Sequence, residues 1–269
     1  MSTDEKIEVI RSERDALAYL GLLSNVAAKF DLPVPFPGES APTHIAGLNI
    51  HALVIDNIDG EIMALERNTI HADGSPLQHG EQRALRTAIN RVGIKRPRTP
   101  DQAIEGYYRS RMFMGVGTAS ADWINSGASL YTTLEPCPMC ATTLLVCRMK
   151  RTTFVLRDGK YGGTWQLIKD KCYPKDEAIY GQLCIVTGIS SVADRVAGMF
   201  MKLIAKTDMA RTQGLRDTHL LDLCRDEAVE AFDMLRQIKS SDLVSVANGD
   251  MRNANTLTGL QKVLGIAVV

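Results

Sequence analysis

The pattern of apolar and polar positions predicts helices at both ends of the chain and a mixed α/β segment between them. Apolar residues recur at helical spacing over residues 2–29, which predicts a helix. Residues 31–38 contain three prolines and a glycine, so an extended linker is expected there. Residues 44–56 and 61–66 are rich in β-branched and apolar types. They flank a turn-like Asn-Ile-Asp-Gly stretch at 57–60, which predicts a β-hairpin.

The rest of the chain alternates helical and extended patterns. The predicted elements are helices over 78–92, 136–148 and 192–204, and strands over 130–134, 152–156 and 183–187. Residues 94–128 show no clear pattern, and the chain beyond 207 is mostly helical, most plainly over 218–238. This order of elements predicts a mixed sheet with helices packed on it.

Composition sets limits on the class of protein. The chain has 269 residues, of which 45% are hydrophobic and 23% charged, which is typical of a globular protein with its own core. Lys+Arg and Asp+Glu each total 31, so the zero net charge argues mildly against a general nucleic-acid binder. Because no apolar run is long enough to cross a bilayer and the first residues are polar and acidic, a cytoplasmic protein without membrane association is expected.

Two short motifs carry most of the chemical information: His79 with Glu81 two residues on, and Cys137 with Cys140 three residues on. Zinc favours tetrahedral sites built from imidazole nitrogen and thiolate sulfur. Two cysteines at this spacing at a helix start project to one face, where the helix N-terminus favours thiolates. With His79 as third ligand, a fourth position stays open, as in catalytic zinc sites. Glu81 is then expected to move protons without ligating the metal.

Each motif taken alone has other interpretations. A Cys-x-x-Cys pair alone is more often half of a structural zinc site, a redox pair or chance, and a histidine before a helix is often only a polar cap. A structural site would need a fourth Cys or His near either motif in the sequence, and none is present. A redox pair would need no His-x-Glu. The combination of the two motifs therefore predicts a catalytic zinc site.

The motifs resemble the signature of the cytidine and deoxycytidylate deaminase superfamily, H-x-E with P-C-x-x-C. The runs Leu130–Cys140 and Leu183–Ile189 resemble its branch of tRNA adenosine deaminases and guanine deaminases. The resemblance implies an α/β, three-layer αβα cytidine-deaminase-like fold, with a mixed five-stranded sheet whose last two strands are parallel. It covers about 44–206, so the expected organisation is an N-terminal helix and Pro-rich linker over 1–43, a zinc-dependent deaminase domain over 44–206 and a helical C-terminal extension over 207–269.

The resemblance also assigns roles to residues. It implies Zn²⁺ as cofactor, Glu81 as the catalytic residue, and a substrate-binding asparagine eleven positions before the zinc histidine, where Asn68 stands. A side-chain amide suits the edge of a heterocycle, although asparagine also commonly ends a strand. Two departures are evident: Gly80 replaces the usual alanine, and residues 74–78 differ from the family's Asp-Pro-Thr-Ala run. That run shapes the pocket in relatives, so the resemblance does not imply which substrate is used.

The expected reaction is hydrolytic deamination of an amino-substituted nucleobase, nucleoside or related heterocycle, with release of ammonia. A tRNA adenosine deaminase or other nucleic-acid deaminase is the first alternative, supported by the motifs and by a basic insert at 95–111 that contains two tyrosines. A catalytically inactive, zinc-stabilised partner subunit is the second, which the presence of Glu81 disfavours. Trp165 suits stacking on a base and packing in the core equally. The resemblance further implies a homodimer.

Overall fold

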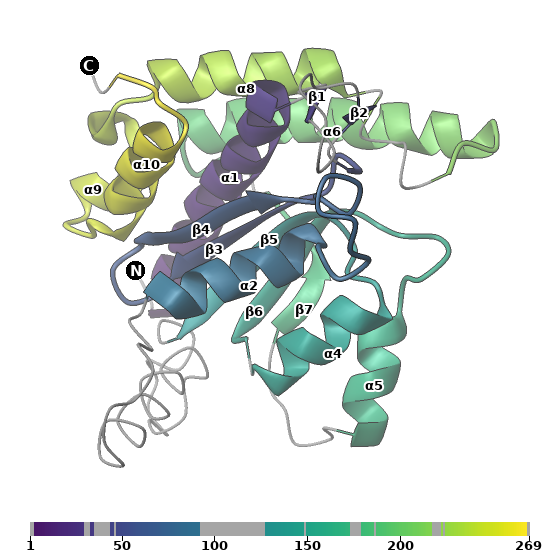
Figure 1. Cartoon of the computed structure of the whole chain (residues 1–269). Helices are drawn as coiled ribbons and strands as arrows, with labels where there is room; N and C mark the ends of the chain where they lie inside the picture. Colours follow the sequence, from purple (N-terminus) through teal and green to yellow (C-terminus); the bar gives the residue numbers. More distant parts are fainter. Residues whose placement is uncertain are drawn as a thin grey trace.

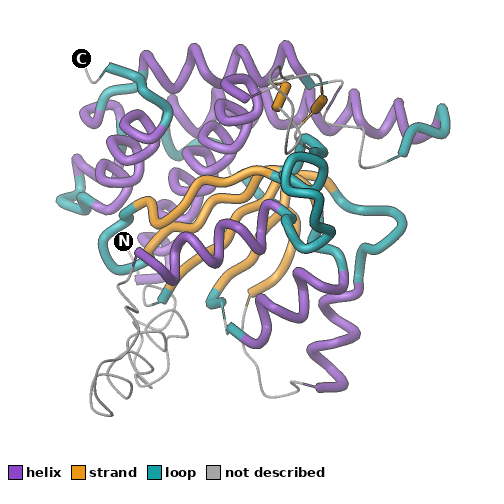
Figure 2. Tube along the Cα trace, in the orientation of Figure 1, coloured by secondary structure: helices purple, strands orange, loops and turns teal. Residues whose placement is uncertain are grey.

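The computed structural model describes residues 3–29, 33–34, 44–45, 47–91, 127–147, 149–172, 179–185, 187–216, 222 and 224–267. Its centre is a five-stranded sheet in the order β4-β3-β5-β6-β7, with helices on both faces (Figures 1 and 2). The strands are β3 (His51–Asp56), β4 (Ile62–Arg67), β5 (Ala128–Leu134), β6 (Arg151–Leu156) and β7 (Ile179–Gln182).

The sheet is mixed, as predicted. β3 pairs antiparallel with β4 and with β5, whereas β5, β6 and β7 run parallel to one another. The predicted hairpin is therefore present, and Gly60 in its turn has φ 81°, a conformation that glycine adopts without a Cβ penalty. The prediction that the last two strands are parallel is confirmed.

Helices cover the two faces of the sheet and complete the three layers (Figure 1). On one face lie α2 (Gly80–Arg91), α4 (Pro138–Val146) and α5 (Thr164–Cys172), where small side chains of α2 pack on β3 and β5. On the other face lie α1 (Thr3–Lys29) and α6 (Ser191–Thr212). The chain then continues through α8 (Arg225–Gln237), a 3₁₀ turn (Ser240–Asp242), α9 (Val244–Ala247) and α10 (Arg252–Val263).

The N-terminal helix α1 is enclosed between the sheet and the C-terminal helices. Its residues from 13 to 26 are all buried, and α1 contacts α6, α8 and α10 as well as β3 and β5. The two carboxylates on this buried stretch find partners. Asp15 forms a two-pronged ion pair with Arg151 at 2.6 and 2.7 Å, and Glu13 accepts hydrogen bonds from the backbone N–H groups of Val244 and Ser245. The helix is thus built into the main core.

Two strand predictions are corrected. The strand expected over 44–56 begins only at His51, because His44–Ile45 (β2) pairs with Pro33–Val34 (β1) in a separate two-stranded ladder. The last strand, expected over 183–187, lies at Ile179–Gln182 instead. β7 is an edge strand that pairs only with β6 and stays half-buried, so it lacks the continuous apolar run that marks a central strand. The apolar residues from Leu183 onward follow β7 in the sequence and precede α6.

Several helix bounds also differ from the predictions. The helix expected from residue 136 begins at Pro138, because Cys137 is extended and occupies the N-cap position. The helix expected over 192–204 continues to Thr212, and the one expected from 218 begins at Arg225. α5 was not predicted. The helix is rich in polar and charged residues, and Trp165 is the one buried residue among those described for it, so the sequence shows no apolar helical period there.

Three expectations concern the organisation of the chain as a whole. None of the helices within the described residues is long and apolar enough to span a bilayer. The division into 1–43, 44–206 and 207–269 stays a prediction, and α6 runs across its second boundary. The basic insert at 95–111 lies outside the described residues.

Candidate metal centre and active site

The first half of the site lies at the start of α2, where a polar loop leads from β4. The loop is closed by a hydrogen bond from the backbone N–H of Thr69 to the carbonyl of Gln78 at 3.0 Å, so His79 stands directly before the helix. Gly80 passes close to the sheet. A Cβ at this position would lie 2.8 Å from the carbonyl oxygen of Ile50, so alanine would force the helix away from β3. The packing therefore explains the glycine between His79 and Glu81.

The second half of the site lies at the start of α4, which follows β5. Cys137 adopts an extended backbone with φ −65° and ψ 170°, and its carbonyl accepts the first helical hydrogen bond, from Ala141 at 2.8 Å. Pro138 occupies the first turn, where its fixed φ suits a helix start and its missing N–H is not needed. Cys140 lies in the same turn and is buried. Both sulfurs are thus held at one helix terminus.

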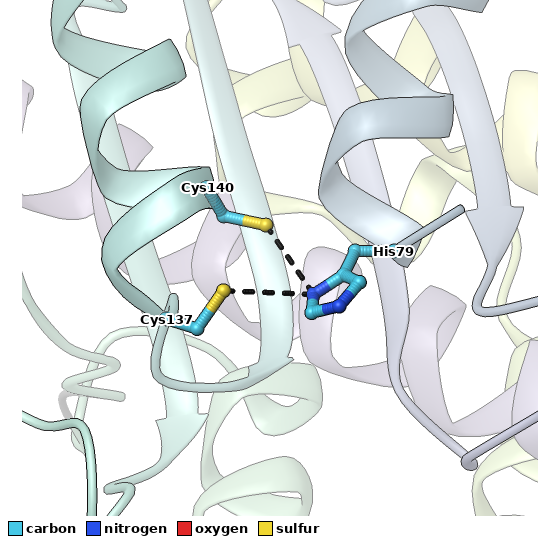
Figure 3. A group of neighbouring side chains, drawn as sticks. All are labelled: His79, Cys137 and Cys140. Atoms are coloured by element: carbon cyan, nitrogen blue, oxygen red, sulfur yellow. Dashed lines mark hydrogen bonds between the residues drawn. The ribbon is translucent and has the colours of Figure 1, made fainter. Parts of the chain in front are cut away.

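The two halves bring three ligand-type atoms together (Figure 3). His79 Nδ1 lies 3.5 Å from Cys137 Sγ and 3.6 Å from Cys140 Sγ, and all three atoms lie within 4.8 Å of one another. Tetrahedral zinc, with bonds of about 2.0–2.1 Å to nitrogen and about 2.3 Å to sulfur, would hold nitrogen and sulfur about 3.6 Å apart. The donor set and its spacing therefore fit a zinc ion with three protein ligands.

The pKa values of this group are shifted by the hydrogen bonds among its three side chains. The pKa of the Cys137 thiol falls to about 4, because the Cys140 thiol and then the His79 ring donate hydrogen bonds to its sulfur. The pKa of Cys140 is raised, chiefly because its thiol is the donor in that bond. Hydrogen bonding to Cys137 also raises the pKa of His79. A metal ion that binds here would have to displace the protons that Cys140 and His79 retain.

Glu81 lies in the first turn of α2 with a side chain that is 3% exposed. Its Oε2 atom is buried and has no hydrogen-bond partner among the described residues. Burial raises its pKa to about 7, and the negative charge of Cys137 adds to the effect. A buried carboxylate oxygen without a partner is costly unless a ligand or a proton satisfies it. Glu81 therefore offers a proton-accepting oxygen beside the ligand group without belonging to it.

Asn68 directly follows β4 and is 1% exposed. Its side-chain oxygen accepts a hydrogen bond from the backbone N–H of Ile70 at 3.1 Å. Its backbone N–H donates to the carbonyl oxygen of Ile50 at 2.8 Å. The side-chain Nδ2 is buried and has no partner among the described residues. Asn68 thus helps to end the strand, as asparagine commonly does, while keeping two N–H donors free.

Glu135 is a residue to which the sequence analysis assigned no role. It is buried one residue before Pro136, and its carboxylate accepts hydrogen bonds from the backbone N–H groups of Gly163 (2.9 Å) and Asp158 (3.3 Å) and from the Tyr180 hydroxyl (3.3 Å). It therefore ties the start of α4 to the glycine-rich loop after β6. The only signal in the sequence was its place immediately before the Pro-Cys pair.

Trp165 belongs to the core. Its side chain is buried and packs with Ala141 and Leu145. The ring centroids of Trp165 and Tyr180 lie 4.4 Å apart with an interplanar angle of 8°, so the two rings are stacked. Tyr180 covers one face of the Trp165 ring, and the buried indole has little surface open to a nucleobase. Of the two interpretations given to Trp165, the packing role is the one that the structure supports.

Comparisons with known proteins agree with this geometry. Residues 40–156 match the family model described as the cytidine and deoxycytidylate deaminase zinc-binding region. The chain is 25% identical to tRNA-specific adenosine deaminases from Bacillus subtilis, over 57% of this chain and 78% of that one, and from Aquifex aeolicus, over 45% and 69%. The match confirms the resemblance inferred from the two motifs.

Solved structures give more distant likenesses. A structure from a study of tRNA:A34 deaminases is 22% identical, with a TM-score of 0.34 over 50% of this chain and 82% of that one. A guanine deaminase from Nitrosomonas europaea is 13% identical, with a TM-score of 0.36 over 64% and 91%. These likenesses are too remote to bear on the substrate of this chain.

Proposed function

Because residues 40–156 match the family model of the cytidine and deoxycytidylate deaminase zinc-binding region, we propose that the chain is a zinc-dependent hydrolytic deaminase. Its substrate is an amino-substituted nucleobase, nucleoside or related heterocycle, which is converted to the oxo form with release of ammonia. The observation that carries the proposal is the zinc-compatible spacing of His79, Cys137 and Cys140 beside the unpartnered Oε2 atom of Glu81.

Each residue then has a defined task. His79, Cys137 and Cys140 hold the zinc ion, which when bound supplies a Lewis acid that makes water an effective nucleophile near neutral pH. Glu81 takes a proton from the attacking water as its oxygen adds to the ring carbon that bears the amino group. Glu81 returns that proton to the adjacent ring nitrogen. It then moves the remaining hydroxyl proton of the adduct to the amine, so that the C–N bond breaks as the C=O bond forms and ammonia leaves. One water is consumed and one ammonia is formed.

Asn68 is the proposed substrate-binding residue. Leaving a buried amide donor unpaired costs about 1–3 kcal/mol, which a substrate acceptor would recover. The side chain is held on its oxygen side by Ile70, so Nδ2 is presented in one orientation. A ring or sugar acceptor placed against it would orient the substrate relative to Glu81.

A nucleic-acid substrate is the second candidate, because the relatives at 25% identity are tRNA-specific adenosine deaminases. The zero net charge and the altered loop at 74–78 favour a small molecule instead. An inactive partner subunit is disfavoured because Glu81 is present and buried beside the ligand group. A homodimer and a cytoplasmic location stay predictions.

The experiment is ammonia release by the zinc-loaded protein, measured against a panel of bases, nucleosides, nucleotides and unmodified tRNA. Glu81→Gln should abolish turnover while zinc stays bound, because glutamine keeps the size of the side chain but cannot accept the proton. Turnover of tRNA alone, with binding that weakens steeply as salt rises, would replace the small-molecule proposal with the nucleic-acid one. Near-normal activity of Glu81→Gln would remove Glu81 from its role.

A further inference from the structure

The two helices that carry the proposed metal ligands are joined by a short series of hydrogen bonds. Gln82 on α2 donates from Nε2 to the hydroxyl of Thr143 on α4 at 2.7 Å, and reaches the carbonyl of Met139 at 3.5 Å. The Thr143 hydroxyl in turn donates to the same Met139 carbonyl at 3.0 Å. The series therefore runs from the residue after Glu81 to the residue before Cys140.

The position of this link within the fold allows it to set the distance between the two helix starts. α2 follows β4 and α4 follows β5, and these two strands are separated by β3. No ladder hydrogen bond therefore joins the strands from which the two helices start. Yet the metal centre needs His79 from one helix start and both cysteines from the other, within 4.8 Å. A direct side-chain bond between the first turn of α2 and the second turn of α4 supplies the spacing that the sheet does not set.

The residue types also suit this task. Gln82 and Thr143 are both half-buried, so water competes only weakly for their hydrogen bond. The hydroxyl of Thr143 accepts from Gln82 while it donates to Met139, so both of its roles are used.

We propose that Gln82 is a positioning residue: through Thr143 it fixes the separation of His79 from Cys140 and thereby strengthens metal binding at the centre. This inference rests on the metal-holding part of the proposed function and not on turnover. Partners that orient metal ligands in this way typically change metal affinity by about 10- to 100-fold when they are removed.

The test is the zinc dissociation constant, measured by competition with a chromogenic chelator at constant pH. Gln82→Met keeps the length of the side chain but cannot donate, and Thr143→Val keeps its shape without the hydroxyl. Each should weaken zinc binding by about 10-fold or more. The double variant should be no weaker than either single variant by more than about twofold, because both changes break one link. Thr143→Ser, which retains the hydroxyl, should restore affinity close to that of the parent.

A matched control separates this role from general stability. Thr87 lies on the same helix α2, and its hydroxyl donates to Glu66 on β4 at 2.8 Å, without contact to α4 in that bond. Thr87→Val should therefore leave zinc affinity within about threefold of the parent, although it too loses a half-buried hydrogen bond. The visible absorption of the cobalt-loaded protein gives a second measurement, because it reports the ligand geometry. It should change in Gln82→Met and stay unchanged in Thr87→Val.

Three results would overturn the inference: unchanged zinc affinity and cobalt spectrum in Gln82→Met, an equal loss in Thr87→Val, or additive losses in the double variant. If Gln82→Met does not fold, the pair Thr143→Val and Thr143→Ser decides the same question. Failure of the parent protein itself to bind zinc would instead overturn the proposed function. The two failures are therefore distinguishable.

Discussion

Replacing His51 with glutamine should remove a specific part of the protein's sensitivity to mild acid. His51 begins β3 and is fully buried, and its Nδ1 lies 2.8 Å from the side-chain nitrogen of Asn25 on α1, which donates to it. Its Nε2 has no partner among the described residues. Burial lowers the pKa of His51 to about 3, and the positive charges of Lys29 and Arg67 act in the same direction. The ring is thus neutral in the folded protein.

The size of the effect follows from the two pKa values. In the unfolded chain His51 titrates near 6.5, so between pH 6.5 and about 3 the unfolded state binds one more proton here than the folded state. The contribution of His51 to stability is therefore complete above pH 6.5 and is lost as the pH falls. Each pH unit below 6.5 costs about 1.4 kcal/mol, so the parent protein loses about 2 kcal/mol at pH 5 from this group alone.

Urea denaturation at about pH 7.5 and about pH 5 gives the free energy of unfolding of the parent and of His51→Gln. Glutamine retains an acceptor for Asn25 and does not titrate, and all other groups are common to both proteins. Between the two pH values the parent should therefore lose about 2 kcal/mol more than the variant. The same substitution at the exposed His71 serves as the control. A difference below about 0.5 kcal/mol would refute the argument that His51 is held neutral by burial.

Three further substitutions test other parts of the structure. Gly80→Ala puts a Cβ 2.8 Å from a backbone carbonyl oxygen and should lower the free energy of unfolding by about 1–3 kcal/mol, measured in urea. Asp15→Ala leaves the buried Arg151 without its carboxylate and should cost about 3–5 kcal/mol, of which Arg151→Met should recover a part. Glu135→Ala removes the acceptor of the loop N–H groups, so hydrogen exchange of those amides should accelerate by about tenfold or more. If the free energy of unfolding or the exchange rate is unchanged in one of these variants, the role given to the contact that it removes is wrong.

The elements that the sequence predicted best are those whose signals are local. The hairpin of β3 and β4 shows β-branched and apolar runs on both sides of a turn that contains Gly60, and α2 shows a clear helical period. The ligand-type residues were found in the same way, because the short spacings of His79 with Glu81 and of Cys137 with Cys140 are set by one helix turn each.

The elements and residues that the sequence missed depend on contacts across the fold. β7 was misplaced because an edge strand needs only one partner and shows no buried run of its own. Gln82 and Glu135 stand beside the two motifs, but their partners Thr143 and Gly163 come from other elements. The burial of α1 between the sheet and the C-terminal helices likewise follows from packing that no local period encodes.

The enclosure of α1 also means that this helix is synthesised well before the segments that cover it. Glu13 accepts hydrogen bonds from the backbone N–H groups of Val244 and Ser245, which lie 231 and 232 positions further along the chain. α10 packs against the same helix. The first helix therefore leaves the ribosome long before the segments that cover it. Until those segments are made, its apolar surface stays open to other chains, and closing so long a loop is slow. Exposed apolar surface of this kind favours aggregation, so the interval before α8 and α10 are made is the one in which this chain is most exposed to it.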